Sequence, residues 1–283
     1  SVTLCWLASA LLARMQRMLK INVRTSISVL SLLLLVWTAL EISGSTRSGS
    51  FTLDQLAVHG RDTLNSVRDI RRFASSVNDD MLSVSANPNL LNGLQGKDVF
   101  VVFAESYGRV LLEREPFAEA VTAALVSAEE TLAAEGVQVR SAYLTSPVVG
   151  GLSWLAHASV LSGAWIDSET RFKTLVMSDR LTLNRLFQNS GWRTIAAMPG
   201  ITMLWPEGKY FGYDHIYNAH NFGYKGEPFN WVTMPDQYVM SALQKRERNG
   251  LLRAPVMAEV ALISSHAPWT PIAKLVPWDK VGD

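Results

Sequence analysis

Three segments of the chain place a polar side chain with useful chemistry beside an apolar run or a tight turn. Glu105 directly follows the apolar run 99–104, Ser153 follows the Gly-Gly pair at 150–151, and His266 comes shortly after the apolar run 256–263. Such apolar, β-branched runs are typical of strands buried in a parallel sheet. Ligands collect at the carboxyl ends of these strands. We therefore predict that Glu105 and Ser153 lie close together at that edge of a sheet.

A carboxylate, a hydroxyl and an imidazole are groups that suit metal-assisted phosphoryl transfer. A divalent ion held by Glu105 and Ser153 Oγ would make the hydroxyl a stronger nucleophile and would polarise a phosphoryl oxygen. Ser153 is expected at a helix N-terminus, where free N–H groups favour an anionic ligand. His266 and His157 would hydrogen-bond the phosphate or protonate the leaving oxygen, and Trp231 would pack against a substrate headgroup.

Each of these residues also has a purely structural interpretation. Glu105 could cap the turn that follows it, and Ser153 could be an ordinary helix N-cap. His157 could be a buried, hydrogen-bonded core residue, and His266 could bond a backbone carbonyl in a loop. For Trp231, burial in the core is the commoner fate.

The elements that must position these side chains alternate between helix and strand. This alternation predicts an α/β fold with a largely parallel sheet sandwiched by helices. The predicted strands are 98–104, 137–144, 194–198 and 256–263, and the predicted helices are 116–135, 153–161, 175–190 and 235–248, with an amphipathic helical segment within 51–94.

The N-terminal residues predict attachment to a membrane. Residues 2–13 resemble the end of one transmembrane helix, and a second transmembrane helix is expected over about 21–41, because 25–40 carries no charge. Four basic residues lie between the two runs, which predicts a cytoplasmic loop and an extracytoplasmic remainder. We therefore expect a membrane region over 1–43, a linker and helical segment over 44–96, and a catalytic domain over 97–283.

Composition bounds the partners and the redox chemistry. The formal net charge is +1, which favours no nucleic-acid partner, and the expected surroundings are the lipid bilayer of a plasma or inner membrane. Cys5 is the single cysteine, so the chain cannot form an internal disulfide or a cysteine-rich zinc site.

Four patches of the sequence, in this order, are similar to those of a known family. They are KDVFVVFAESYG, GGLSWLAHASVLSG, GWRTIAAMPG with the following FGYDHIY and NWVTMPDQYV, and AEVALISSHAPWTP. Together they resemble the sulfatase-like branch of the alkaline phosphatase superfamily, including lipoteichoic acid synthases and other membrane-anchored phospho-group transferases. The resemblance implies that Glu105 is an acidic metal ligand, Ser153 the nucleophile and a ligand, and His266 a substrate contact. It also implies a divalent cofactor (Mn, Mg, Zn or Ca) and a phospholipid headgroup or envelope glycan as substrate.

Two departures from the family pattern limit the function. Formylglycine sulfatases need Pro and Arg where this chain has Leu155 and His157, which disfavours sulfatase activity. The family's later Asp-His metal pair would lie beyond Asp283, so the chain is expected to be truncated at both ends. With Glu105 and Ser153 as its two ligands, where a catalytic site typically has three, the chain is expected to be inactive by itself.

The sequence thus predicts an extracytoplasmic, metal-dependent phosphoryl or phospho-group transferase or hydrolase with a serine nucleophile. The alternative is a catalytically silent binding or scaffold domain on the same fold, because fold-level likeness does not fix function. A sulfuric ester hydrolase is the third possibility.

Overall fold

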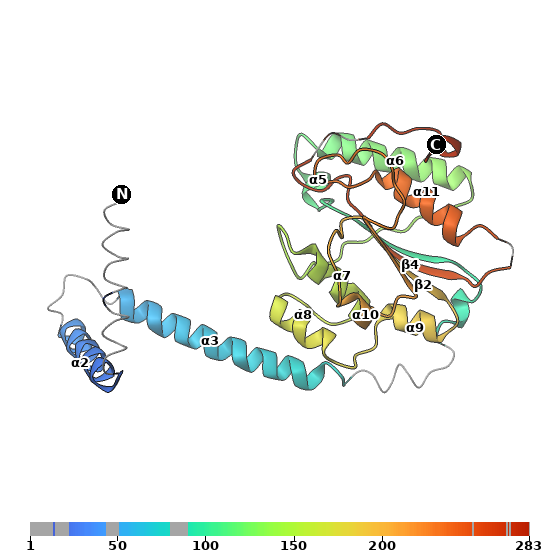
Figure 1. The fold of residues 1–283 in the computed structure, drawn as a ribbon. Coiled ribbons are helices and arrows are strands. Elements are labelled where there is room, and N and C mark those ends of the chain that lie inside the picture. The colour runs from blue at the N-terminus through green and yellow to red at the C-terminus, as the bar shows by residue number, and fades with distance from the viewer. Residues whose placement is uncertain are drawn as a thin grey trace. The chain divides into compact units, whose positions relative to one another are not determined.

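The computed structural model describes Arg14 and residues 23–43, 51–79, 90–250, 252–269, 271 and 273–282. The chain divides into two compact units, Ser1–Asp69 and Ile70–Asp283 (Figure 1). Most of the predicted first helical end and basic loop over 1–22, and the linker residues 44–50, lie outside the described residues.

The N-terminal unit contains helix α2 (Val23–Ile42) and the start of helix α3 (Phe51–Ser76). A helix therefore forms over the range in which we predicted a transmembrane span, 21–41. None of the helices in the described part of the chain, however, has the combination of length and apolar character that crossing a membrane requires. The prediction of a transmembrane helix is not confirmed by the structure.

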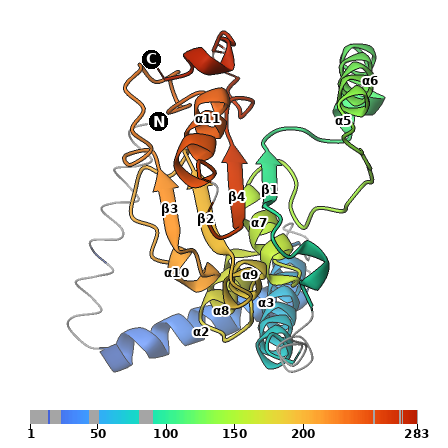
Figure 2. The same ribbon diagram turned by 90° about the vertical axis from the view of Figure 1, so that its right-hand side faces the viewer.

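The C-terminal unit is built on a four-stranded sheet in which all neighbouring strands run parallel. Its order is β1–β4–β2–β3, and Figure 2 shows the four strands side by side. This sheet confirms the predicted α/β class and places the ends of β1 and β4 next to each other. The strands are β1 (Val99–Ala104), β2 (Arg193–Met198), β3 (His215–Asn218) and β4 (Val256–Leu262).

Helices lie on both faces of the sheet (Figure 1). Helix α11 packs through Val239 and Leu243 against one face. Helices α7 to α10 lie on the opposite side, where Phe187 of α9 packs against Met257 of β4. The helices of this unit, besides the end of α3, are α5 (Val110–Glu113), α6 (Ala118–Ala134), α7 (Ser153–Ser162), α8 (Glu169–Val176), α9 (Leu183–Asn189), α10 (Gly208–Phe211) and α11 (Asp236–Glu247), with 3-10 turns η1 (Asn92–Leu94) and η2 (Trp278–Lys280).

The pleat of strand β4 decides which of its side chains reach each layer. Successive residues of a strand point to opposite faces. Val256, Ala258 and Val260 belong to the core shared with α11. Residues 257, 259 and 261 therefore point to the face that α7 and α9 cover. Glu259 is the one charged residue in this strand, and it is directed into that second layer.

Two predicted elements differ from the structure, and one observed strand has no predicted counterpart. Residues 137–144 form no strand and do not pair with the sheet. The apolar side chains of Val137 and Leu144 are accordingly exposed, by 47% and 86%. The helix predicted over 175–190 is interrupted: α8 ends at Val176, and α9 begins after Thr182, whose hydroxyl accepts the backbone N–H of Arg185. Strand β3 was not predicted.

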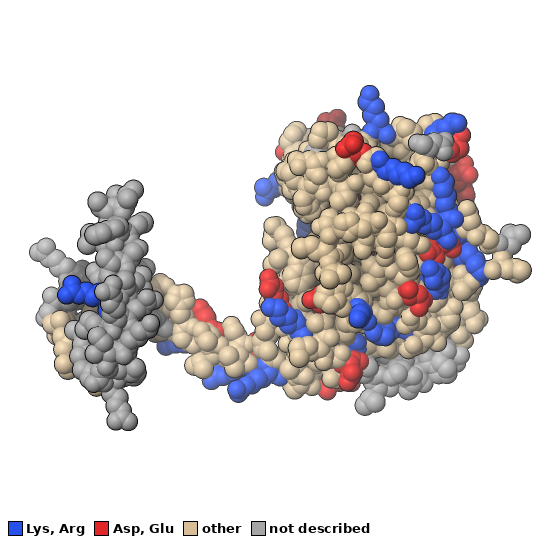
Figure 3. Space-filling model, viewed as in Figure 1, with Lys and Arg blue, Asp and Glu red and all other residues tan. Residues whose placement is uncertain are grey.

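Charged side chains are spread over the surface of the C-terminal unit. Figure 3 shows acidic and basic residues interspersed on the face in view, with wide areas of other residues between them. One group of charges also orders the sheet edge, since Asp98 at the start of β1 bonds the backbone N–H of Val256 at the start of β4.

Candidate active site

Glu105 lies at the carboxyl end of β1, as the sequence predicted. Its backbone N–H donates to the carbonyl of Leu262, and its own carbonyl accepts from Ser265 Oγ at 2.6 Å. These two bonds hold the end of β1 against the end of β4. By strand alternation the Glu105 side chain shares a face with Phe103, and it is 15% exposed.

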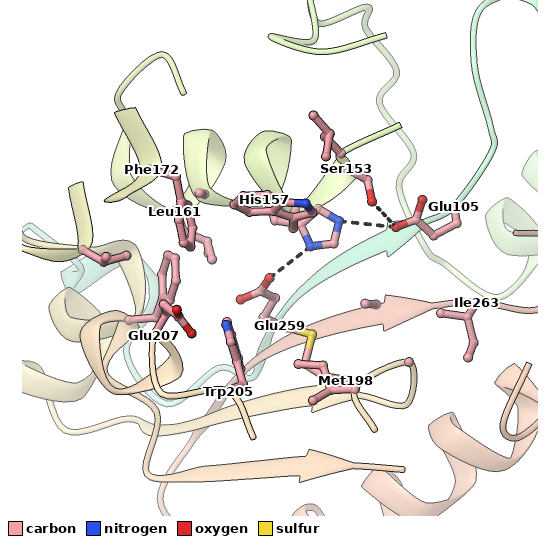
Figure 4. A pocket seen from close by; sticks show the side chains of 18 of the residues that line it. Glu105, Ser153, His157, Leu161, Phe172, Met198, Trp205, Glu207, Glu259 and Ile263 are labelled. Carbon is pink, nitrogen blue, oxygen red and sulfur yellow. Dashed lines mark hydrogen bonds and ion pairs between the residues drawn. The ribbon is translucent and has the colours of Figure 1, made fainter. Parts of the chain in front are cut away.

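Ser153 is the first residue of helix α7, and its hydroxyl points at this carboxylate. Ser153 Oγ donates to Glu105 Oε1 at 2.9 Å (Figure 4). We predicted that the two side chains lie within roughly 5 Å, on the assumption that they share an ion with bonds of about 2.0–2.6 Å. The predicted proximity is confirmed, although the two residues are 48 positions apart in the chain.

His157 lies one helical turn after Ser153 and faces two carboxylates from different strands. Its Nε2 is 3.7 Å from Glu105 Oε1, and its Nδ1 is 3.5 Å from Glu259 Oε1 (Figure 4). The imidazole stacks on the ring of Phe103, with 3.7 Å between the centroids and 12° between the planes. These contacts fix the ring in position and orientation.

Glu259 is the most deeply buried carboxylate of the site, with 2% of its side chain exposed. Besides facing His157, it accepts a short hydrogen bond from the hydroxyl of Tyr213. Burial, together with the negative charge of Glu259, raises the pKa of Tyr213 well above its ordinary value of 10. The phenol therefore keeps its proton at neutral pH and donates a hydrogen bond to the carboxylate.

A cavity of about 600 Å³ opens onto Glu105, Ser153 and His157. His266 and Trp231 also line it, and their rings stack on each other with centroids 4.1 Å apart. All five residues that the sequence singled out therefore border one cavity. Its wall is otherwise largely apolar and includes Trp154, Leu161, Phe172, Val176, Trp205 and Phe211.

Four non-glycine residues with a left-handed backbone stand beside this site. Ser106 (φ 63°) follows Glu105, and Leu152 (φ 55°) precedes Ser153. Asn230 (φ 57°) precedes Trp231, and Trp269 (φ 52°) lies three residues after His266. Left-handed backbone costs an L-residue roughly 1–2 kcal/mol, and such costs concentrate where a site dictates the chain path.

Replacing Leu152 with glycine should therefore raise the free energy of unfolding by about 0.5–1 kcal/mol, because glycine adopts this backbone without strain but loses more entropy on folding. Urea unfolding measures the change. Leu204→Gly is the matched control: Leu204 is almost fully exposed and is not among the left-handed residues, so this change should not stabilise. If the two substitutions changed the free energy of unfolding equally, or if Leu152→Gly lowered it, the backbone of Leu152 would not be strained.

Glu259 and Tyr213 are two site residues that we did not predict from the sequence. A signal for Glu259 was present, since it stands inside the apolar run 256–263. A carboxylate in the middle of a buried strand needs a partner, and that requirement marks it as part of a polar network. Tyr213 carries no comparable signal, because its role depends on the contact that the segment before β3 makes with Glu259 of β4.

The side chains around Glu105 offer some of the ligands that a divalent ion needs. Within the described residues, no three His, Cys, Asp or Glu side chains converge on one position that could hold a metal. The set around Glu105 instead combines a carboxylate, an imidazole and the hydroxyl of Ser153, whose oxygen and nitrogen donors are those that divalent ions accept.

Comparison with known proteins finds likeness in one solved structure. No protein-family model matches the chain, and no curated protein sequence is significantly similar to it. The crystal structure of the lipoteichoic acid synthase LtaP from Listeria monocytogenes superposes with a TM-score of 0.49 at 19% sequence identity. The superposition covers 73% of this chain and 49% of that protein, so the chain spans about half the length of LtaP.

Proposed function

We propose that this chain catalyses metal-dependent transfer or hydrolysis of a phospho group, with Ser153 as the nucleophile. The observation that carries the proposal is the 2.9 Å hydrogen bond from Ser153 Oγ to Glu105 Oε1 at the edge of the cavity. A serine hydroxyl needs an adjacent base or metal to become nucleophilic. Here a carboxylate from the end of β1 meets a hydroxyl at the start of α7.

Glu105 and Ser153 are the residues that would hold a divalent ion. When bound, the ion would supply positive charge that favours the alkoxide form of the nucleophile and polarises the phosphoryl oxygen. The fit rests on the donor set, since both side chains offer oxygen atoms that face each other at an accessible cavity.

The residues of the chain perform the remaining work. Ser153 Oγ forms a bond to phosphorus, its proton passes to the carboxylate of Glu105, and the bond from phosphorus to the leaving oxygen breaks. The leaving oxygen then takes a proton from water. The N-terminus of α7 directs its free backbone N–H groups toward the developing negative charge. An alcohol or water then forms a bond to phosphorus, and the bond from phosphorus to Ser153 Oγ breaks. Ser153 Oγ takes its proton back from Glu105, and the proton of the attacking group passes to the hydroxide left by the first step. An alcohol as the attacking group gives transfer, and water gives hydrolysis.

The lining of the cavity supports an organic phosphodiester as the substrate. His266, stacked on Trp231, lies on the same cavity as Ser153 and can hydrogen-bond a phosphate oxygen. The apolar wall formed by Phe172, Leu161 and Trp154 suits a substrate whose phosphate carries an apolar group. A phospholipid headgroup with part of its glycerol backbone has this chemistry.

A covalent adduct on Ser153 is the direct test. The purified chain is incubated with bis(p-nitrophenyl) phosphate and Mn²⁺, quenched in acid, digested and analysed by mass spectrometry. We expect release of p-nitrophenolate and a p-nitrophenyl phosphoryl adduct on the peptide that contains Ser153. An adduct on another residue would overturn the assignment of the nucleophile. If p-nitrophenolate is not released and no adduct forms, the result would favour a silent binding domain.

A further inference from the structure

We propose that His157 is a third protein ligand of the divalent ion, through Nε2, and that Glu259 is the positioning residue that holds its ring from the other side. This inference rests on the proposed function only in assuming an ion at Glu105 and Ser153. From the sequence we predicted that His157 contacts the substrate, and Glu259 had no predicted role.

Helix geometry already places His157 on the correct side. Residues four apart on a helix lie on the same face, one turn from each other. Ser153 and His157 have this spacing in α7, and both side chains face Glu105 Oε1. One carboxylate oxygen is therefore approached by a hydroxyl and an imidazole that the same helix presents.

The distances fit three ligands of one ion better than a network of hydrogen bonds. The 3.7 Å between His157 Nε2 and Glu105 Oε1 is too long for a hydrogen bond. Two donors bound to one ion at about 2.0–2.2 Å, with ordinary coordination angles, lie about 2.8–3.8 Å apart. The distances of 2.9 Å and 3.7 Å both fall in this range.

The opposite nitrogen of the imidazole faces a carboxylate, a group often found beside that nitrogen in known metal sites. A histidine that binds a metal almost always donates its other ring N–H to a carboxylate, carbonyl or water. His157 Nδ1 lies 3.5 Å from Glu259 Oε1, and the other oxygen of that carboxylate accepts from Tyr213. Nδ1 thus faces Glu259, and Nε2 is the ring nitrogen directed toward Glu105.

A purely structural role explains this arrangement less well. A buried carboxylate costs free energy unless it is paired, yet Glu259 stands in a strand whose other residues are apolar. Phe103 and Glu259 fix the imidazole from two directions, and this fixed ring borders the cavity. The expectation of an inactive chain rested on a count of two ligands, and His157 raises the count to three.

Titration calorimetry with Mn²⁺ tests both assignments. We expect the purified chain to bind one Mn²⁺, with an affinity that falls at least about 100-fold in His157→Ala and about 10–100-fold in Glu259→Gln, the usual effect of removing an outer carboxylate. The matched control is His220→Ala, because His220 is exposed and bonds Thr202; its affinity should stay within about twofold. If Glu259→Gln lowers the melting temperature but leaves the affinity unchanged, Glu259 is only structural.

Pulsed electron paramagnetic resonance of the wild-type chain loaded with Mn²⁺ provides a measurement that does not depend on folding of a variant. A directly bound imidazole nitrogen should give a ¹⁴N coupling, which changes to that of ¹⁵N when the chain is made with ¹⁵N-labelled histidine. Bound Mn²⁺ without this coupling, or no binding of Mn²⁺, would overturn the role of His157. The adduct on Ser153 is scored separately, so ligation by His157 without an adduct would remove the proposed function and leave this inference standing.

Discussion

Replacing Ser153 with alanine is expected to lower the turnover of a phosphodiester by at least about 10³-fold. Removing the nucleophile of a covalent mechanism eliminates the intermediate, and the residual rate comes from binding and electrostatic stabilisation alone. The substitution removes a single oxygen, and that oxygen makes one hydrogen bond, to Glu105. The fold should therefore persist, and the loss should appear in kcat rather than in the melting temperature.

The control for this experiment is another serine at a helix end. Ser190 is exposed at the C-terminal end of α9, and its hydroxyl bonds the carbonyl of Leu186. Ser190→Ala should leave kcat within about twofold of the wild-type value. If Ser153→Ala retained more than about a tenth of the wild-type kcat, a serine nucleophile would be excluded.

Replacing Asp98 with asparagine is expected to lower the free energy of unfolding by roughly 2–4 kcal/mol, because hydrogen bonds to charged groups contribute more than neutral ones and their loss leaves partners unpaired. The carboxylate is 12% exposed and accepts from Arg253 Nη2 at 2.6 Å, from Arg248 Nε at 2.8 Å and from the backbone of Val256 at 2.9 Å. Urea unfolding at pH 7 measures the loss. The exposed pair of Arg109 and Glu113 serves as control, since Glu113→Gln should cost far less.

The same carboxylate predicts how stability depends on pH. The hydrogen bond from Arg253 is the main cause that holds the pKa of Asp98 well below its ordinary value of 3.8, against the opposing effect of burial. A lowered folded-state pKa means that the unfolded chain binds the proton more readily. The stabilisation is therefore complete above about pH 4 and is lost as pH falls below 3.8. Asp98→Asn should flatten the decline of stability in this range; an unchanged slope would contradict it.

Much of the architecture was predictable because the strands that build it are short, apolar and bounded by polar residues. Strands 98–104, 194–198 and 256–263 were found within one or two residues of their observed limits. The proximity of Glu105 and Ser153 was predicted correctly, but only one premise of that prediction held. Glu105 follows the end of β1, whereas the strand expected over 137–144, ahead of Ser153, does not form, and Ser153 lies at the start of α7. Local pattern and the strand-end rule were therefore sufficient to place Glu105, while the contact from Ser153 depends on where α7 lies.

The rest could not be predicted because it depends on contacts between distant segments. The run 137–144 has residues that favour strands, yet it remains exposed because no edge of the sheet receives it. The role of Glu259 depends on the order of the strands, since β4 lies between β1 and β2. Only that order brings its carboxylate under His157, and periodicity in the sequence does not encode it.

The central position of β4 also affects how the protein is made. Ribosomes synthesise chains from the N-terminus, and β1 and β2 flank a strand that is translated long after both. The pairing of Asp98 with Val256 spans 158 residues, so closing this loop is slow and costs entropy. Until β4 emerges, β1 lacks the strand with which it pairs in the sheet, and both of its edges are open to other chains. The site is therefore not assembled in a nascent chain that lacks β4. A chaperone that shields β1 during translation would increase the yield of folded protein.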